Sequence, residues 1–167
     1  MTDLSLLQPP GCAAAQPASN APAKVPHGVG SPAPIDADDA RFIGLLDAFR
    51  PLGGIAALRE LERRARATRE GQALHFAQWL SEGKLFALHW NGAHWFPLFQ
   101  FRRVSMAPEP AMAHLLAELR ATHDAWEFAA WLARPNGFLQ GSAPASVIRH
   151  DAAAVVRAAR ADRFLCS

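Results

Sequence analysis

One segment near the end of the chain, residues 130–160, constrains the fold most: "AWLARPNGFLQGSAPASVIRHDAAAVVRAAR". The helix that begins this segment must end before Pro135, because the residue preceding a proline is disfavoured in helical geometry. Gly141 lies in the loop that follows and keeps it from continuing as a helix. Pro144 fits the first turn of a short helix, and Asp151 can cap a final helix. The segment therefore predicts a helical unit whose helices are joined by short turns.

Upstream of that segment's loop, apolar residues recur at helical spacing in five places. In the first of them Phe42, Leu45 and Phe49 lie on one helix face, and the acids at 36–39 can cap its start. The last of them follows a capping residue, Asp124. The five predicted helices span about 38–50, 55–68, 72–83, 109–121 and 125–133. The chain is therefore expected to be mainly helical.

The periodicity changes between residues 84 and 101, where "KLFALHW" and "HWFPLFQF" flank "NGA". Asn-Gly between two β-prone runs is the strongest short-range signal for a β-hairpin. Pro97 cannot donate a ladder hydrogen bond, so the second strand is an edge strand or ends there. The aromatic residues Trp90, Trp95, Phe96 and Phe99 favour a hairpin that covers a hydrophobic core. The alternative is an exposed wing, because helices followed by a small hairpin are the order of a winged helix-turn-helix.

The first 36 residues are rich in Pro, Ala, Gly and Ser and hold no aromatic residue, so they are predicted to be a disordered tail. The two cysteines, Cys12 and Cys166, stand near opposite ends and form no disulfide framework. The N-terminus lacks the basic residues of a signal peptide, and no run approaches the length of a membrane span. A cytoplasmic protein without membrane contact is expected.

The sequence lacks the common catalytic patterns. It contains no GxSxG, no P-loop and no GxGxxG that opens a helix. His123 and Glu127 are spaced four apart on a predicted helix, but the second histidine and third ligand of a zinc site are missing. We therefore expect no enzyme, no cofactor and no metal.

The charge of +2 hides a basic middle, since residues 41–103 carry ten basic and five acidic side chains. This balance favours contact with a polyanion such as promoter DNA. The alternative is a solvated face, because glutamates stand four residues before two of the arginines. Bases would be read weakly by the outward glutamines and histidine of the predicted 72–83 helix. The candidate DNA-binding residues are Arg59, Arg63, Arg66, Gln72, His75 and Gln78.

The C-terminal pattern resembles the toxin-binding domain of the MbcA/ParS/Xre antitoxin family. That domain has a helix ending in Trp-Leu, a Pro-Asn turn, a Leu and a Gly, a Pro that opens a helix, and an acid-capped final helix. Upstream, "WFPLFQF" is similar to the segment ending in Pro-x-x-Gln-Phe that often precedes the domain, so the resemblance covers roughly residues 80–160. The matching positions are Trp131, Leu132, Pro135, Asn136, Leu139, Gly141, Pro144, Ile148, Asp151 and Val155.

The resemblance implies an antitoxin that binds and occludes a protein toxin, commonly of the RES type that degrades NAD, and that often binds its own promoter. The runner-up is a stand-alone DNA-binding transcription regulator without a toxin, and a homodimer is left open. For Asn136 a structural role in the turn is favoured, and direct contact with the partner is the alternative. The other candidates are expected to face solvent, because Val155, Val156 and Ala159 take the inward positions of the final helix. The candidate partner-binding residues are Asn136, Arg149, His150, Arg157 and Arg160.

The expected architecture is thus mainly α with one small β-hairpin. A helix-turn-helix-like region with a hairpin wing, residues 37–103, follows the tail, and a helical toxin-binding-like domain covers residues 104–163.

Overall fold

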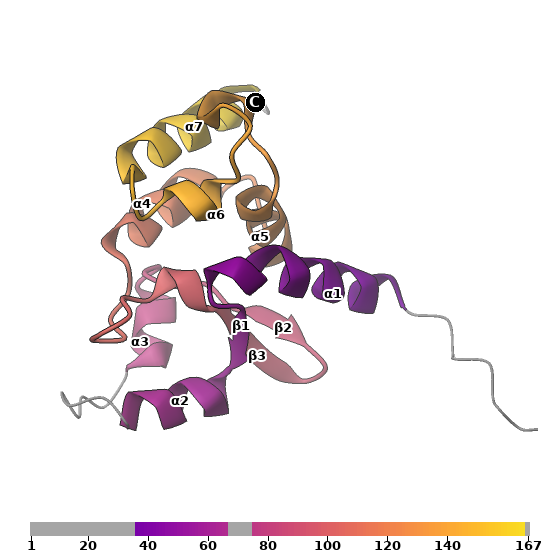
Figure 1. Cartoon of the computed structure of the whole chain (residues 1–167), viewed down its shortest axis with the longest axis vertical. Coiled ribbons are helices and arrows are strands. Elements are labelled where there is room, and N and C mark those ends of the chain that lie inside the picture. The colour runs from indigo at the N-terminus through magenta and orange to yellow at the C-terminus, as the bar shows by residue number, and fades with distance from the viewer. Residues whose placement is uncertain (1–35, 67–74, 166–167) are drawn as a thin grey trace, which may run out of the picture. The chain divides into compact units, whose positions relative to one another are not determined.

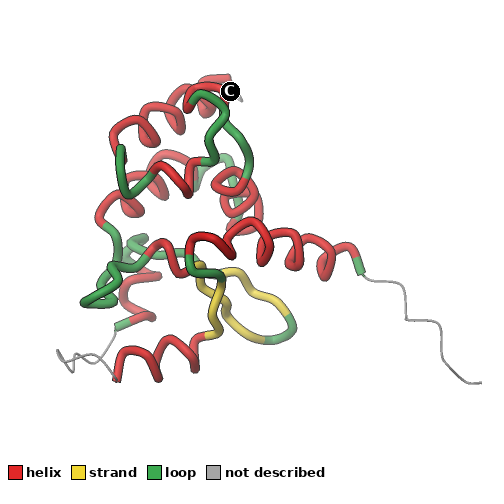
Figure 2. Tube along the Cα trace, in the orientation of Figure 1, coloured by secondary structure: helices red, strands yellow, loops and turns green. Residues whose placement is uncertain are grey.

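The computed structural model describes residues 36–66 and 75–165. Except for Asp36, the predicted tail lies outside these residues, as do the candidate Gln72 and both cysteines. Helices make up most of the described chain, which confirms the mainly helical expectation (Figures 1 and 2). The elements are α1 (Ala37–Phe49), η1 (Arg50–Leu52), β1 (Ile55–Ala57), α2 (Leu58–Arg66), α3 (Phe76–Ser81), β2 (Leu88–Trp90), β3 (Ala93–Pro97), η2 (Leu98–Gln100), α4 (Pro110–Leu119), α5 (Ala125–Ala133), η3 (Gly137–Leu139), α6 (Pro144–Val147) and α7 (Ala152–Leu165).

The predicted helix at 55–68 is wrong in its first turn, because Ile55–Ala57 forms strand β1. The sheet therefore has three antiparallel strands in the order β1-β3-β2 instead of a lone hairpin. Gly53 and Gly54 both have positive φ (108° and 85°), which turns the chain after η1. The chain then runs extended, and Ala56 pairs with Phe96 of β3. Pairing with a distant strand thus overrides the local helical pattern, which resumes at Leu58.

The hairpin between β2 and β3 is confirmed at its turn. Asn91 and Gly92 both adopt left-handed conformations (φ 47° and 70°), as a two-residue hairpin turn of the primed type requires. Strand β3 ends at Pro97, and the chain continues as the short helix η2. Both strands are shorter than predicted, since residues 84–87 and 98–101 lie outside them.

The Gln100 side chain bonds part of the backbone that the predicted longer strands would have paired. This side chain is fully buried, and its amide bonds both backbone groups of Phe86. Oε1 accepts from the Phe86 N–H at 3.1 Å, and Nε2 donates to the Phe86 carbonyl at 3.0 Å. The glutamine of the Pro-x-x-Gln-Phe segment therefore has a structural task, because it satisfies backbone groups that would otherwise be buried unpaired.

The larger of two hydrophobic clusters joins α1 and the hairpin to α4, α5, α6 and α7. Phe96 and Phe99 are buried, and the half-buried Trp90 ring stacks on Phe42 at 4.1 Å between centroids. These aromatics thus pack on the core, as the sequence favours. The smaller cluster lies under α2 and α3 and contains Ala56, Leu61, Phe76, Leu85, Phe96, Phe101 and Met106. The larger cluster takes residues from both sides of the expected boundary at 103/104, so this boundary does not divide the core.

Helices α5, α6 and α7 begin at the residues that the sequence indicates, whereas α4 ends at Leu119, before the predicted residue 121. Asp124 forms a capping box with Glu127 at the start of α5, and Pro144 opens α6. The Asp151 carboxylate accepts a hydrogen bond from the Ala154 N–H at 2.8 Å in the first turn of α7. Helix α7 packs along α4 (Figure 1). In the described ranges, every helix is too short or too polar to cross a bilayer.

Candidate functional site

The turn that follows α5, residues 134–142, carries the centre of the antitoxin-like pattern and is called the motif turn below. Arg134 is extended (φ −89°, ψ 146°), as expected before Pro135, and α5 ends there. Asn136 is also extended (φ −117°), and the left-handed position falls on Gln140 (φ 55°). The Asn136 Oδ1 accepts from the Phe138 N–H at 2.9 Å. Asn136 thus holds the turn through its side chain and not through left-handed backbone geometry.

Asp162 of α7 joins the motif turn to the last helix. Its Oδ2 accepts a hydrogen bond from the Trp131 Nε1–H at 2.6 Å and another from the Asn136 Nδ2–H at 2.7 Å. Hydrogen bonds to an ionised carboxylate are about twice as strong as neutral ones. Trp131 and Asn136, both part of the family-like pattern, therefore fix one surface turn against α7.

A hollow of about 580 Å³ opens beside this junction, and we call it the motif hollow. Two arginines and two acids balance its charge, and the Arg41 guanidinium lies over the Trp126 ring at 5.2 Å. Such a mixture offers donors and acceptors at fixed positions, which suits the binding of polar side chains. Its lining residues are Arg41, Thr122, His123, Glu127, Ala130, Trp131, Arg134, Pro135, Asn136 and Asp162.

The motif turn also presents a large apolar side chain to solvent. Phe138 is 58% exposed although it lies between the half-buried Asn136 and the buried Leu139. Its backbone N–H is held by Asn136, so the ring stands on an ordered turn. An aromatic side chain held this way is typical of an anchor for another protein, since aromatic residues are enriched at interface cores.

The five candidate partner-binding residues do not converge on one site. Asn136 lines the motif hollow, and both ends of its amide are already bonded within the chain. Arg149 and His150 line a second hollow, and Arg157 and Arg160 line a third.

Arg149 is tied to the hairpin half of the chain. Its Nη2 donates to the carbonyl oxygens of Phe99 at 3.2 Å and of Phe101 at 3.0 Å. These bonds bridge 50 and 48 residues, so the turn between α6 and α7 is fastened to the segment that follows η2. Arg149 therefore has a structural task that its exposed position in the sequence pattern did not indicate.

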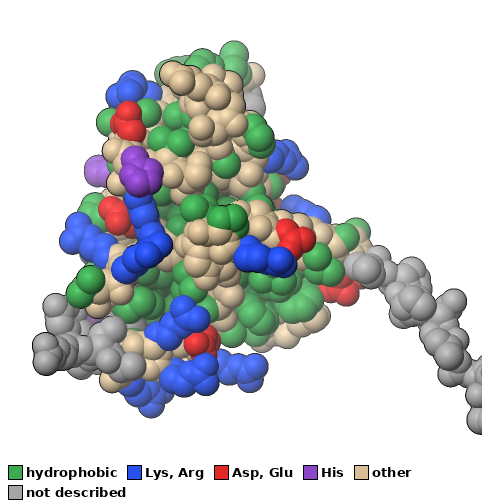
Figure 3. Space-filling view, in the orientation of Figure 1, with side chains coloured by type: hydrophobic (Ala, Val, Ile, Leu, Met, Phe, Trp, Pro, Cys, Tyr) green, Lys and Arg blue, Asp and Glu red, His purple; other side chains and the backbone are tan. Residues whose placement is uncertain are grey.

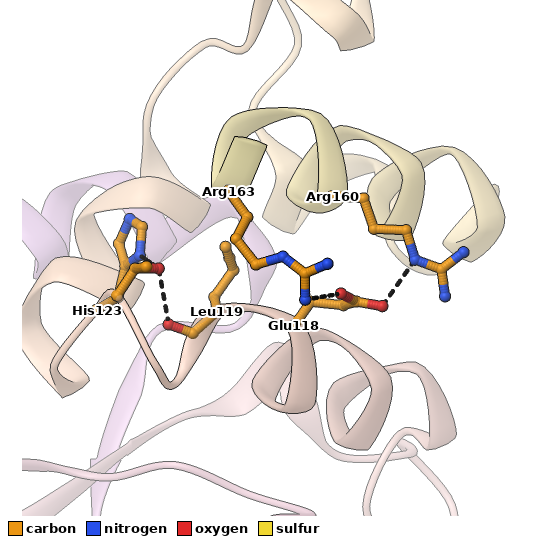
Figure 4. A network of polar contacts seen from close by, with 6 residues as sticks. Glu118, Leu119, His123, Arg160 and Arg163 are labelled. Atoms are coloured by element: carbon orange, nitrogen blue, oxygen red, sulfur yellow. Dashed lines mark hydrogen bonds and ion pairs between the residues drawn. The ribbon is translucent and has the colours of Figure 1, made fainter. Parts of the chain in front are cut away.

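Arg160 is also engaged, because it and Arg163 reach from α7 to Glu118 of α4 (Figure 4). The N···O distances are 2.7 and 2.8 Å, one to each carboxylate oxygen. The hydrogen bond from Arg160 lowers the pKa of Glu118 below its ordinary 4.5, and the positive charges of both arginines add to this effect. The carboxylate side chain is only 15% exposed. This cluster clamps the two longest C-terminal helices together.

The candidate DNA-binding residues of α2 are exposed, but most are paired within the helix. Arg63 forms an ion pair with Glu60, and Arg66 lies 3.7 Å from Glu62. Arg64 also bonds Glu60 at 2.8 Å, and its hydrogen bond is the main reason why the pKa of Glu60 is lowered. Arg59 lines a shallow hollow on the same helix.

The described candidate residues at α3, His75 and Gln78, are also exposed. The Gln78 Nε2 donates to the Glu82 Oε1 at 2.7 Å, so its amide is partly engaged. His75 is exposed immediately before the helix begins, and Gln72 lies outside the described residues. Of the candidate base-reading residues, the structure thus places the two described ones, His75 and Gln78, at an exposed surface.

Sequence reasoning missed Asp162, Glu118 and Phe138. Asp162 and Glu118 act through partners 26 to 45 residues away, and helical spacing cannot reveal such contacts. Phe138 carried a weak signal, since an aromatic residue between turn residues is unusual for a solvent-facing loop.

A scan against protein-family models matches no family, and searches of curated proteins and of solved structures return no similar protein. The antitoxin resemblance therefore rests on the motif residues themselves. Within the described ranges, no group of three or more His, Cys, Asp or Glu side chains is placed to hold a metal ion.

Proposed function

We propose that this chain is a non-enzymatic, antitoxin-like protein that binds and occludes a protein toxin through its C-terminal helical unit. One observation carries the proposal: the residues of the family-like pattern build a hydrogen-bonded turn on which Phe138 is exposed and whose Asn136 lines the motif hollow. Trp131 and Asn136 hold this turn against Asp162 through their side-chain N–H groups. The family-like residues are thus the scaffold of the binding surface, and the exposed neighbours make the contact.

The surface combines two features that protein interfaces use. Phe138 supplies an apolar anchor, and Arg134 at the start of the turn is an exposed arginine that lines the motif hollow. Aromatic residues and arginines carry most of the binding energy where they become desolvated at the centre of an interface. Because the turn is already ordered, little conformational entropy is lost when a partner docks. By resemblance, the partner is a RES-type toxin that degrades NAD.

The test is to look for a RES-type protein encoded beside this gene and to co-express the two, followed by growth measurement and co-purification. We expect the unaltered chain to restore growth, and Phe138→Ala to weaken toxin binding by about thirtyfold, the effect of losing an interface hot spot. Val104→Ala is the control, since Val104 is an apolar residue on a different loop that is more exposed than Phe138 (83% against 58%).

Deletion of α7 is not a clean test, because Val155, Ala158 and Ala159 belong to the core. If no RES-type gene stands beside this one, or if Phe138→Ala and Val104→Ala behave alike, the proposed interface is wrong.

Promoter binding through α2 and α3, and with it the stand-alone regulator, stays a prediction. The exposed arginines favour it, whereas their pairing with Glu60 and Glu62 favours a solvated face. Winged-helix geometry, a homodimer and a cytoplasmic location are likewise expectations from the sequence.

A further inference from the structure

A second hollow, of about 540 Å³, lies between the loop that precedes α4 and the turn between α6 and α7. Its rim carries Arg102, Arg103, Arg149 and His150, against a single acid, Glu109. Its wall is apolar and includes Leu52 and Phe99. We call it the basic hollow. Its three arginines and Glu109 sum to +2.

Arg149 is the fixed element of the basic hollow. Its Nη2 is held by two backbone carbonyls, of Phe99 and Phe101. Carbonyls orient a guanidinium without neutralising its charge, and a guanidinium has further N–H groups on Nε and Nη1. In the described part of the chain, no carboxylate forms an ion pair with Arg149. The hollow therefore holds a preoriented positive charge.

Arg102 and Arg103 directly follow Phe101, whose carbonyl binds Arg149. Their loop is closed by backbone hydrogen bonds, from the Arg102 N–H to the Ala107 carbonyl at 2.8 Å and from the Met106 N–H to the Arg102 carbonyl at 2.9 Å. Both side chains are exposed, and among residues 36–66 and 75–165 neither forms an ion pair. Three arginines that form no ion pair among the described residues thus share one hollow with a single acid, Glu109.

Two other hollows differ in this respect: the motif hollow and the hollow along α2 that Arg59 lines, called the α2 hollow. The motif hollow has as many acids as arginines. The α2 hollow holds Arg59, Arg63 and Arg64 against Glu60, but Arg63 and Arg64 both form ion pairs with that glutamate. On the face drawn in Figure 3, Lys and Arg side chains and a histidine gather over the loop between α6 and α7 and the segment next to α4. The two hollows thus carry the same formal charge of arginines and acids, but the arginines of the basic hollow form no ion pair among the described residues, whereas two of the three in the α2 hollow do.

We propose that the basic hollow binds a phosphate group, held by Arg149 together with Arg102 and Arg103. Planar guanidinium groups match the oxygens of a phosphate through paired hydrogen bonds, which a lysine cannot do. The volume lies in the range of small-ligand sites, so a phosphate with an attached group fits beside the apolar wall. The phosphate comes from a free phosphate or mononucleotide, or from the backbone of a nucleic acid.

This site shares no residue with the motif turn, so its failure and the failure of the proposed toxin interface are separate results. The test is calorimetric titration of the full chain at low ionic strength with inorganic phosphate, AMP, adenosine and a short DNA duplex. Binding of phosphate and AMP identifies a small ligand as the source. Binding of the duplex alone identifies the nucleic-acid backbone. Adenosine, which lacks the phosphate, is expected not to bind.

The deciding variant is Arg102→Gln/Arg103→Gln, in which two exposed side chains lose their charge and the backbone bonds of the loop stay. We expect it to weaken binding of whichever phosphate-bearing probe binds by at least about tenfold. Arg149→Lys keeps the charge but loses the planar fork, so it should weaken binding too.

The matched control is Arg63→Gln/Arg66→Gln on α2, which removes the same charge from the same chain. We expect it to change affinity by less than about threefold, because those arginines are already paired and long-range effects are screened. The proposal is overturned if no phosphate-bearing probe binds, if adenosine binds as well as AMP, or if the control weakens binding as much as the Arg102/Arg103 variant.

Discussion

Helix α2 and the α4–α7 unit both carry many charged side chains, but they use them differently. On α2 the arginines pair with Glu60 and Glu62, three or four residues away in the same helix. In the C-terminal unit the charged groups reach across the fold, from Asp162 to the motif turn and from Arg160 to Glu118.

This difference shows that the separation of two interacting residues in the sequence decides whether their contact stabilises one helix or the tertiary structure. A pair within one helix favours only that helix, because its two residues are close in the sequence and need no other element to meet. A pair between distant elements is made only when the tertiary structure forms. Charge counts along the sequence cannot separate these cases, although they have different consequences for stability and for the charge left to bind a partner.

The strongest test of this contrast is Asp162→Ala. The change leaves two half-buried donors, the Trp131 Nε1–H and the Asn136 Nδ2–H, without their acceptor. We expect a loss of about 1–3 kcal/mol in the free energy of unfolding, the cost of unsatisfied polar groups. Chemical denaturation measures it.

Asp162→Asn retains one acceptor oxygen without the charge and should lie between the two proteins. If Asp162→Ala is as stable as the unaltered chain, Asp162 does not hold the motif turn, and the contrast with α2 is lost.

Local signals predicted the parts of the fold that depend on neighbouring residues. The Asn91–Gly92 turn, the Asp124 cap and the helix stop at Pro135 each follow from backbone preferences of one or two residues. Strand β1 could not be predicted this way, because Ile55–Ala57 is extended only through pairing with β3. Its apolar residues are equally compatible with an earlier start of α2.

The candidate site follows the same division. Asn136 was recognised as a turn residue because its role is local. Arg149 was expected to be free for a partner, and its two bonds to the hairpin half could not be foreseen across about 50 residues. Arg102 and Arg103 were part of a charge count and gained meaning only when the fold brought them to Arg149.

A pH titration sharpens the comparison at a smaller scale. The pKa of Glu118 is lowered chiefly by its hydrogen bond to Arg160. The ionised carboxylate therefore stabilises the folded state fully at pH values above its ordinary pKa of 4.5. This contribution is lost as the pH falls through the lowered pKa of the folded state. We expect the Tm of the unaltered chain to exceed that of Glu118→Gln at neutral pH, and the gap to close in acid.

Glu60→Gln is the counterpart on α2, where the pKa is also lowered, mainly by a hydrogen bond from Arg64. Because the ion pairs that Glu60 forms with described residues both lie within α2, the Tm gap at neutral pH should be smaller than for Glu118→Gln. An equal or larger gap for Glu60→Gln would mean that the cross-helix clamp adds nothing to stability.

The smallest effect is expected from Arg63→Gln/Arg66→Gln. Both side chains are largely exposed, and their partners are three and four residues away in the same helix. Exposed ion pairs contribute little, and surface substitutions usually change stability by no more than about 0.5 kcal/mol. Denaturation should therefore give a midpoint close to that of the unaltered chain. A loss as large as that of Asp162→Ala would show that α2 is held through its arginines. The pairs of α2 would then be part of the tertiary structure, and the arginines would be unavailable to a phosphate backbone for a structural reason.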